Sequence, residues 1–215
     1  MIRALRKYYP NGDIGALVRP YAADVFRKNP HLDHLLLDDP VGVDSGSAGF
    51  ARQVRRLRRH RFDTALMPLP SSRHAWMCFL AGIPRRLATS RKLYNRLTLT
   101  RCIRRHATTD PRHEADYCLD LARHIGVPDD GLHTEMFLFE EEVARAEQIL
   151  GPGTFVGIHP SSGHSAPNWP VARYVQLAER ILELSDDIRL VLTGGPEDLS
   201  LATAFASLPK TRVVN

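Results

Sequence analysis

The segment from Phe155 to Pro170 constrains this chain most, because it joins a hydrophobic strand, a loop of small residues and the start of a helix. It reads Phe155-Val-Gly-Ile-His-Pro-Ser-Ser-Gly163, passes through Trp169-Pro170, and continues into an amphipathic stretch. A helix that begins after such a loop presents backbone N–H groups without helical partners and the positive end of its dipole. The segment therefore predicts a binding loop for a phosphate or diphosphate.

A second unit of the same kind follows directly in the sequence. It consists of a strand from Ile188 to Thr193, the loop Gly194-Gly-Pro-Glu-Asp198, and a helix from about Leu199. Two strand–loop–helix units in tandem favour a nucleotide-type ligand, held at the carboxyl ends of parallel strands.

Apolar strands alternate with helical patterns in the rest of the chain, which is typical of an α/β protein with parallel sheets. The breaker cluster Gly151-Pro-Gly153 suits a domain boundary, so we predict domains at 1–150 and 151–215. Residues 39–49 are expected to form a loop, and 97–103 fit either a strand or an irregular segment. The expected helices cover 2–8, 21–28, 52–61, 73–81, 111–125 and 140–150, and the expected strands before the boundary cover 13–18, 35–37 and 64–67.

Composition excludes several classes of protein. No apolar run approaches the roughly 20 residues that span a bilayer, and the first residues lack the apolar core of a secretion signal. Cys78, Cys102 and Cys118 have no metal-ligand or redox spacing. They are expected to be buried thiols in a reducing cytoplasm, and neither a metal nor a cofactor is expected.

The net charge of +5 comes mainly from arginine, much of it within Arg52-Gln-Val-Arg-Arg-Leu-Arg-Arg-His-Arg61. Val54 and Leu57 supply the buried stripe of a short helix, and the arginines cover its other faces. This pattern fits a solvated helix face, and it also fits attraction to an anionic surface such as lipid phosphates. Nucleic acid is the less favoured partner, because no aromatic residues are interleaved for base stacking.

Four stretches in this order resemble glycosyltransferase family 9, the bacterial heptosyltransferases that add heptose to the lipopolysaccharide core. The individual stretches are weak signals, but the ordered set is fairly specific and spans nearly the whole chain. They are residues 2–10 with 17–20, Arg61-Phe-Asp-Thr-Ala65 with Ala81-Gly-Ile-Pro-Arg-Arg86, His113-Glu-Ala-Asp-Tyr-Cys-Leu-Asp-Leu121, and Gly157-Ile-His-Pro-Ser-Ser-Gly163 through Asn168-Trp-Pro170 to Leu192-Thr-Gly-Gly-Pro-Glu197.

The resemblance implies a GT-B fold with two Rossmann-like domains, an acceptor-side domain at 1–150 and a donor domain beginning at 151. It also implies an inverting, metal-independent transfer from ADP-heptose to a lipid-linked acceptor, the lipopolysaccharide core, at the cytoplasmic face of the inner membrane. Carried over by position, the diphosphate would lie at Ser161, Ser162 and Gly163, and the nucleoside at Thr193, Gly194, Gly195 and Glu197.

Three departures from the family pattern qualify this expectation. Pro167 stands where the family commonly has a lysine that neutralises the phosphates. The family's catalytic aspartate would lie upstream of the first helix, so Asp13 is not its equivalent and no base is assigned. The first strand of the acceptor domain and the later half of the donor domain are also expected to be absent. The chain is therefore expected to be an inactive fragment.

Two other classes of function remain open at this point. One is another GT-B enzyme that acts on a nucleotide sugar. The other is a non-enzymatic module that binds anionic lipid or RNA through the arginine-rich helix. The acceptor-side match at Arg61-Phe-Asp63 argues against the first, and salt-dependent binding without a nucleotide effect would favour the second.

Overall fold

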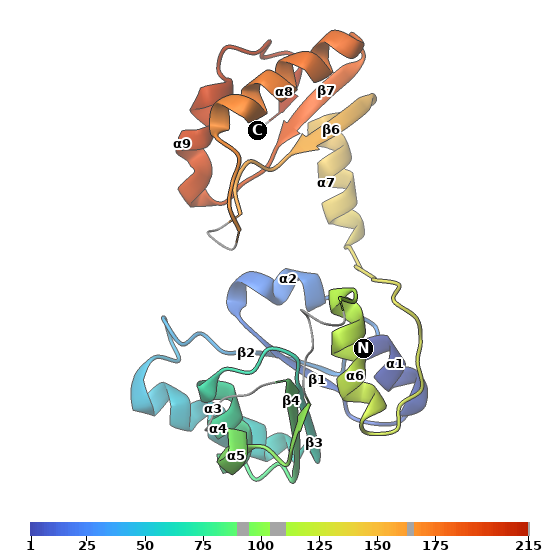
Figure 1. Ribbon diagram of the computed structural model, residues 1–215, viewed down its shortest axis with the longest axis vertical. Helices are drawn as coiled ribbons and strands as arrows, with labels where there is room; N and C mark the ends of the chain where they lie inside the picture. Colours follow the sequence, from blue (N-terminus) through green and yellow to red (C-terminus); the bar gives the residue numbers. More distant parts are fainter. Residues whose placement is uncertain (90–94, 104–110, 163–165, 215) are drawn as a thin grey trace. The chain divides into compact units, whose positions relative to one another are not determined.

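The computed structural model describes residues 1–89, 95–103, 111–162 and 166–214. The chain divides into two compact units, Met1–Leu138 and Phe139–Asn215, and each is described here by itself (Figure 1). Helix α7, Glu140–Leu150, was assigned to the first domain from the sequence but falls in the second unit. None of its residues is buried.

Unit 1 alternates helices with parallel strands, as the sequence predicts. Strands β1 and β2 form one parallel pair, and β3, β4 and β5 form a second parallel sheet in that order. The elements are α1 Ile2–Tyr8, β1 Gly15–Val18, η1 Pro20–Ala22, α2 Ala23–Phe26, β2 His34–Leu37, α3 Gly46–His60, β3 Thr64–Met67, α4 Ser72–Leu80, β4 Arg85–Thr89, α5 Asn95–Thr98, β5 Arg101–Ile103 and α6 Glu114–Arg123.

The larger core of unit 1 lies where α3 and α4 cover the strands. Val54 and Leu57 of α3 pack with Leu36 of β2, Met67 of β3 and Met77 of α4. These two α3 residues are the ones that the arginine-rich pattern marked as its buried stripe. The helix begins at Gly46, earlier than predicted, and ends at His60, followed by the C-cap residue Arg61, whose φ of 53° is left-handed.

Gly49 of α3 is buried against the loop that precedes the helix, and we expect it to tolerate no side chain. A Cβ at this position would lie 2.2 Å from the backbone carbonyl carbon of Asp44. The resulting overlap should outweigh the gain in helix propensity of about 1 kcal/mol. Gly49→Ala should lower the free energy of unfolding by about 1–3 kcal/mol in chemical denaturation.

Gly157 of unit 2 provides the matched control, because an added Cβ there meets no atom within 4 Å and its φ is not left-handed. Gly157→Ala should leave stability nearly unchanged. If Gly49→Ala were as stable as the parent chain, the close approach of α3 to the Asp44 backbone would be wrong.

Strand β4 was not predicted from the sequence, although it is the central strand of its sheet. It pairs with β3 and with β5, and Leu87 and Ala88 are fully enclosed. Its first two residues, Arg85 and Arg86, interrupt the apolar pattern by which a strand is recognised in the sequence. Arg86 is accommodated because its guanidinium donates to the backbone carbonyls of Ile83 and Thr98. The undecided region 97–103 resolves into the end of α5 and β5.

A network of charged side chains ties α1 to the segment after α6. Asp130 accepts hydrogen bonds from Lys7 and Arg3, and Arg3 also lies 2.9 Å from Glu135. Lys7 and Arg3 lower the pKa of Asp130 to about 2, and the hydrogen bond from Arg3 lowers the pKa of Glu135. A depressed carboxylate pKa stabilises the fold above the unfolded value near 4, and this contribution is lost as the pH falls through the folded value.

We therefore expect unit 1 to lose stability between about pH 4 and pH 2 as Asp130 becomes protonated. Asp130→Asn should be less stable than the parent chain at pH 7 and should match it near pH 2, because the parent has then lost the same charge. Urea denaturation at several pH values measures this. Asp187→Asn, at an exposed position in unit 2, should keep the parental pH dependence. An unchanged slope in Asp130→Asn would contradict the assignment.

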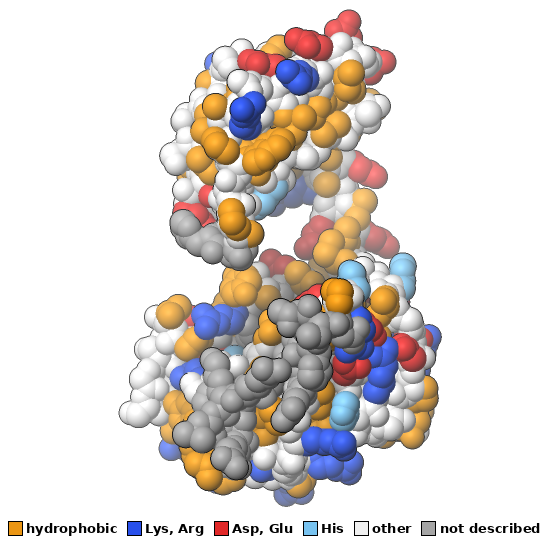
Figure 2. Space-filling view, in the orientation of Figure 1, with side chains coloured by type: hydrophobic (Ala, Val, Ile, Leu, Met, Phe, Trp, Pro, Cys, Tyr) orange, Lys and Arg blue, Asp and Glu red, His pale blue; other side chains and the backbone are white. Residues whose placement is uncertain are grey.

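Unit 2 contains a smaller parallel sheet in the order β6-β7-β8. Its core joins Ile158, Leu190 and Leu192 of the strands to Ala178 and Leu182 of α8. On the face that Figure 2 shows, hydrophobic side chains gather around α8. Besides α7, the elements are β6 Thr154–Ile158, α8 Val171–Leu184, β7 Ile188–Leu192, η2 Pro196–Asp198, α9 Leu199–Ala202, η3 Thr203–Phe205 and β8 Val213–Val214.

Candidate functional site

The two predicted binding loops of unit 2 begin side by side. Strands β6 and β7 are parallel with Ile158 opposite Leu192, and the Thr193 N–H donates to the Ile158 carbonyl at 3.0 Å. The chain leaves both strands at the same edge of the sheet, as parallel strands require. The structure thus brings the residues around Ser161 and those around Gly194 to one edge.

His159 links the two loops, although it was not predicted to be a site residue. Its Nδ1 lies 3.0 Å from the Thr193 hydroxyl, and its side chain is exposed. The signal that could have identified it is its position directly after β6, where side chains of parallel sheets face ligands.

In the serine loop between β6 and α8, the Ser162 side chain bonds to the backbone of a later residue of the same loop. The Ser162 hydroxyl donates to the Ala166 carbonyl at 2.7 Å and accepts from the Ala166 N–H at 3.3 Å. Ser161 is half-buried beside it, and Gly163 lies outside the described residues. Helix α8 starts directly after Pro170, so its first N–H groups and its positive dipole end face this loop.

The second loop combines an exposed hydroxyl with two carboxylates. Thr193, Gly194 and Glu197 are exposed, and the Gly195 N–H donates to the Asp198 carboxylate at 2.9 Å. Both glycines allow the carboxylates to come close, since a Cβ on Gly195 would lie 2.7 Å from a Glu197 carboxylate oxygen. Carboxylates accept hydrogen bonds and repel phosphates, so this loop suits the hydroxyl groups of a sugar.

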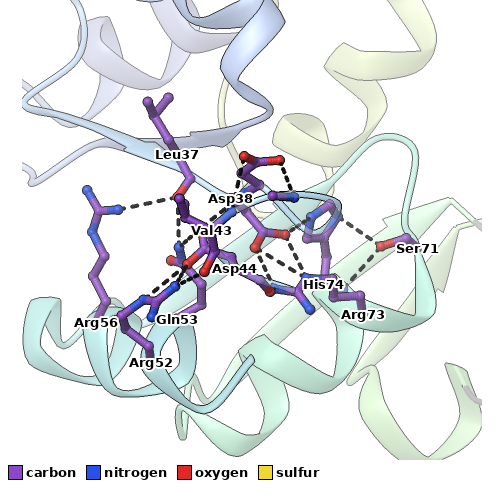
Figure 3. Close-up of polar contacts among 12 residues, drawn as sticks. Leu37, Asp38, Val43, Asp44, Arg52, Gln53, Arg56, Ser71, Arg73 and His74 are labelled. Atoms are coloured by element: carbon purple, nitrogen blue, oxygen red, sulfur yellow. Dashed lines mark hydrogen bonds and ion pairs between the residues drawn. The ribbon is translucent and has the colours of Figure 1, made fainter. Parts of the chain in front are cut away.

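A polar cluster at the carboxyl edge of unit 1 was not predicted from the sequence (Figure 3). Asp38 follows β2, and its side chain is 1% exposed. Arg73 of α4 donates two hydrogen bonds to the Asp38 carboxylate, from Nη2 at 2.7 Å and from Nε at 2.8 Å. His74 Nε2 lies 3.3 Å from the same carboxylate, and His74 Nδ1 lies 3.0 Å from the Ser71 hydroxyl. No sequence motif joins Asp38 to residues about 35 positions later.

Asp44 is the second buried carboxylate of this cluster. It accepts hydrogen bonds from Arg52 at 2.6 Å and from Gln53 at 2.7 Å. Burial alone would raise the pKa of Asp44, but hydrogen bonds from the Asp39 N–H, Arg52 and Gln53 outweigh burial and lower the pKa. Asp44 is therefore charged at neutral pH. Through Arg52 and Gln53 of α3 and Arg73 of α4, the two carboxylates bind the segment after β2 to both helices.

His74 stays uncharged at neutral pH. Burial lowers the pKa of His74, and the positive charges of Arg73 and Arg19 act in the same direction against the attraction of Asp38. A neutral imidazole between Asp38 and Ser71 donates through one ring nitrogen and accepts through the other. The arrangement orients Ser71 at the N-cap of α4, where its hydroxyl also accepts from the His74 N–H.

The arginine-rich helix α3 is only partly available to a partner. Arg52 is bound to Asp44, and Arg56 and Arg58 donate to the backbone carbonyls of Leu37 and Leu80. Arg55 and Arg59 are exposed and form no hydrogen bond or ion pair with another described residue. These two, one turn apart, are the residues of α3 best placed to meet an anionic surface.

The expectation that all three cysteines are buried was wrong for Cys102 and Cys118. Cys78 is buried, and burial raises the pKa of its thiol to about 11. Cys102 is exposed and Cys118 is half-buried.

Within the described part of the chain, no group of three His, Cys, Asp or Glu side chains is placed to hold a metal ion. No described helix has the length and apolar character that crossing a membrane requires.

Comparisons with known proteins agree with this architecture. The model of the family described as glycosyltransferase family 9 (heptosyltransferase) matches residues 50–215. A protein of Haemophilus influenzae, provisionally named a glycosyltransferase, is 26% identical over an alignment of 216 positions that covers 95% of this chain and 61% of that protein. The chain thus spans about three-fifths of the length of this curated relative.

Solved structures show the same fold at low sequence identity. A family 9 glycosyl transferase from Veillonella parvula superposes with a TM-score of 0.82 at 23% identity, over 99% of this chain and 63% of that one. The E. coli ADP-heptose lipopolysaccharide heptosyltransferase II gives 0.75 at 20% identity, over 100% and 66%. A second E. coli heptosyltransferase, solved with ADP, gives 0.70 at 12% identity, over 100% and 68%.

Proposed function

This chain belongs to glycosyltransferase family 9, the heptosyltransferase family, and we propose that it carries part of an enzyme that transfers heptose from ADP-heptose to the inner core of lipopolysaccharide. The α/β fold with parallel sheets matches GT-B heptosyltransferases over part of their length. In this proposal unit 1 is the acceptor-side domain, and unit 2 belongs to the donor domain.

The observation that supports donor binding is the pair of loops at the carboxyl ends of β6 and β7, with the start of α8 behind the first. We propose that the diphosphate lies against Ser161, Ser162 and Gly163. The nucleoside lies near Thr193, Gly194, Gly195 and Glu197, where a carboxylate can accept from a ribose hydroxyl. A related heptosyltransferase was solved with ADP, which is the nucleotide that this arrangement would hold.

The chemistry that these residues could supply is stabilisation of the leaving diphosphate. As the bond from the sugar to the diphosphate breaks, negative charge develops on the departing oxygen. Backbone N–H groups and the positive end of α8 would stabilise that charge without a metal ion. The acceptor hydroxyl must lose a proton to a base, and no described residue is assigned to that role.

Nucleotide-dependent thermal stabilisation of the 215-residue chain tests donor binding. A ligand that binds only the folded state at about 100 times its Kd stabilises by about 2.7 kcal/mol. We expect ADP to raise the melting temperature more than UDP or GDP at the same concentration. Preference for UDP or GDP would indicate another GT-B enzyme, and no response to any nucleotide at millimolar concentration would contradict the proposal.

We further propose that the 215-residue polypeptide by itself does not catalyse transfer. The chain covers 61–68% of the relatives named above, and no base is assigned within it. ADP release from ADP-heptose, measured with a lipopolysaccharide acceptor that lacks heptose, should remain at the background rate. Turnover at the ordinary enzyme rate of about 1 per second or more would contradict this.

A lipid-linked acceptor places the proposed reaction at the cytoplasmic face of the inner membrane. We propose that the protein reaches this acceptor by peripheral contact with the anionic membrane surface. The exposed cations of unit 1, such as Arg55 and Arg59, support attraction to such a surface. RNA is a less favoured partner of the same cations, because the arginine-rich segment carries no interleaved aromatic residues.

A further inference from the structure

The loop that joins β2 to α3, residues Asp39–Ser45, satisfies its own backbone. The Asp39 carboxylate accepts from the Gly42 N–H at 3.0 Å, and the Asp44 carboxylate accepts from the Asp39 N–H at 3.0 Å. The N–H groups of Asp44 and Ser45 donate to the carbonyls of Asp39 and Gly42. This β2–α3 loop is therefore a closed turn whose polar groups bond inward.

The same loop turns two apolar side chains outward. Val41 is 86% exposed and Val43 is 78% exposed. Tyr21, in η1 after β1, and Leu69, in the loop after β3, are 87% and 76% exposed. These four side chains, here called the apolar rim, are four of the five most exposed large apolar residues in the described part of the chain. Single exposed apolar residues are ordinary, but here they share neighbouring loops.

Three contacts bring the loops of the apolar rim to one edge. β1 and β2 are parallel, and the Asp38 N–H donates to the Val18 carbonyl at 2.9 Å, so the loops after these strands start together. Arg73, four residues after Leu69, binds the Asp38 carboxylate and donates to the Asp44 carbonyl at 2.8 Å. The cluster in Figure 3 thus joins the segment that follows β2 to the start of α4.

The charges around the apolar rim are also arranged by sign. The acidic groups Asp38 and Asp44 are buried and paired with Arg73 and Arg52. Asp39 is half-buried, and its carboxylate accepts hydrogen bonds from the Gly42 and Val43 N–H groups. Arg19, the N-cap residue of η1, the element that carries Tyr21, is exposed and has no side-chain hydrogen bond or ion pair with another described residue. Arg52 donates to the Val43 carbonyl, yet its side chain is 56% exposed. A ligand approaching this edge meets apolar tips flanked by cations.

We propose that the apolar rim is the surface by which unit 1 inserts into the headgroup region of an anionic lipid bilayer. Apolar tips flanked by basic side chains match the two forces that bind interfacial segments to membranes. A bilayer interior offers no partner for backbone groups, and the β2–α3 loop needs few, because most of its N–H groups are already bonded. The inference rests on the proposed peripheral contact and assigns it to these loops rather than to α3.

Cosedimentation with lipid vesicles tests the assignment. The 215-residue chain is mixed with vesicles of phosphatidylethanolamine and phosphatidylglycerol, and with vesicles of phosphatidylcholine alone. The test variant Val41→Ser/Val43→Ser leaves the charge unchanged at exposed positions. Leu184→Ser is the matched control, because Leu184 is 77% exposed in unit 2. Arg55→Gln/Arg59→Gln measures the contribution of α3.

We expect the parent chain to bind the anionic vesicles. The affinity of the valine variant for the same vesicles should be about tenfold lower. Leu184→Ser should bind like the parent. If the valine variant kept full binding while the arginine variant lost it, the assignment of the membrane contact to the apolar rim would be wrong, but the proposed peripheral contact would stand. If the parent chain bound no anionic vesicle, both the assignment to the apolar rim and the proposed peripheral contact would be wrong. A parent dimer that the valine variant dissociates, without vesicle binding, would instead assign the rim to a second copy of the chain.

Discussion

Replacing Asp38 with alanine is expected to lower the free energy of unfolding by about 3–5 kcal/mol. The side chain of Asp38 is 1% exposed and that of Arg73 only 20%, so the substitution leaves a largely enclosed guanidinium without its counter-charge. His74 loses the acceptor of its Nε2 at the same time. Urea denaturation followed by circular dichroism measures the change.

The control for this prediction is the ion pair between Asp24 and Arg27. It has the same 2.7 Å separation as Asp38 and Arg73, but its side chains are 75% and 57% exposed. Surface pairs contribute about 0–1 kcal/mol, so Asp24→Ala should cost little. The double variant Asp38→Ala/Arg73→Met should recover part of the loss, because it removes the unpaired charge. Equal costs for Asp38→Ala and Asp24→Ala would contradict the buried pairing.

Ser161→Asp is expected to weaken ADP binding by about a hundredfold or more. A carboxylate about 4 Å from a phosphate group opposes it by about 4 kcal/mol at an effective dielectric constant near 20, and about 1.4 kcal/mol corresponds to a tenfold change in affinity. The added negative charge also competes with the ligand for the positive end of α8. Isothermal titration of ADP into the parent and the variant measures the loss.

Ser185→Asp places the same substitution at the other end of α8, where Ser185 is the exposed C-cap. It changes the net charge equally but lies away from the loop, so ADP affinity should change by less than about twofold. Equal weakening in both variants would indicate a general charge effect. An unaltered affinity in Ser161→Asp would remove the diphosphate from the serine loop.

The predicted elements that matched the structure are those with a strong local pattern. Helix α7 was predicted at its observed bounds, and β3 likewise, because an uninterrupted apolar run or a clear start and stop signal marked each. The start of α3 was placed too late, since Gly46, Ser47 and Gly49 resemble a loop. Gly49 is tolerated there because α3 must approach the Asp44 backbone closely, a requirement that no local pattern reveals.

In the candidate donor site too, the local sequence predicted some features, and tertiary contacts decided the others. The sequence located both loops, and the parallel pairing of β6 and β7 places them at one edge. It did not indicate that the Ser162 hydroxyl closes its own loop, that the Gly195 N–H is held by Asp198, or that His159 contacts Thr193. These contacts depend on the path of each loop, which side-chain hydrogen bonds select.

By itself, the sequence determined the family, the alternation of helices with parallel strands, and the position of the small-residue loop before α8. Those features depend on the order of apolar, small and breaker residues, which local backbone preferences translate directly into structure. Only the tertiary structure decided that Arg73 and His74 meet the buried carboxylate of Asp38, and that the segments carrying Tyr21, Val41 and Val43 leave β1 and β2 at one edge. Strand pairing brings these distant residues together, and burial then requires the charges to be paired.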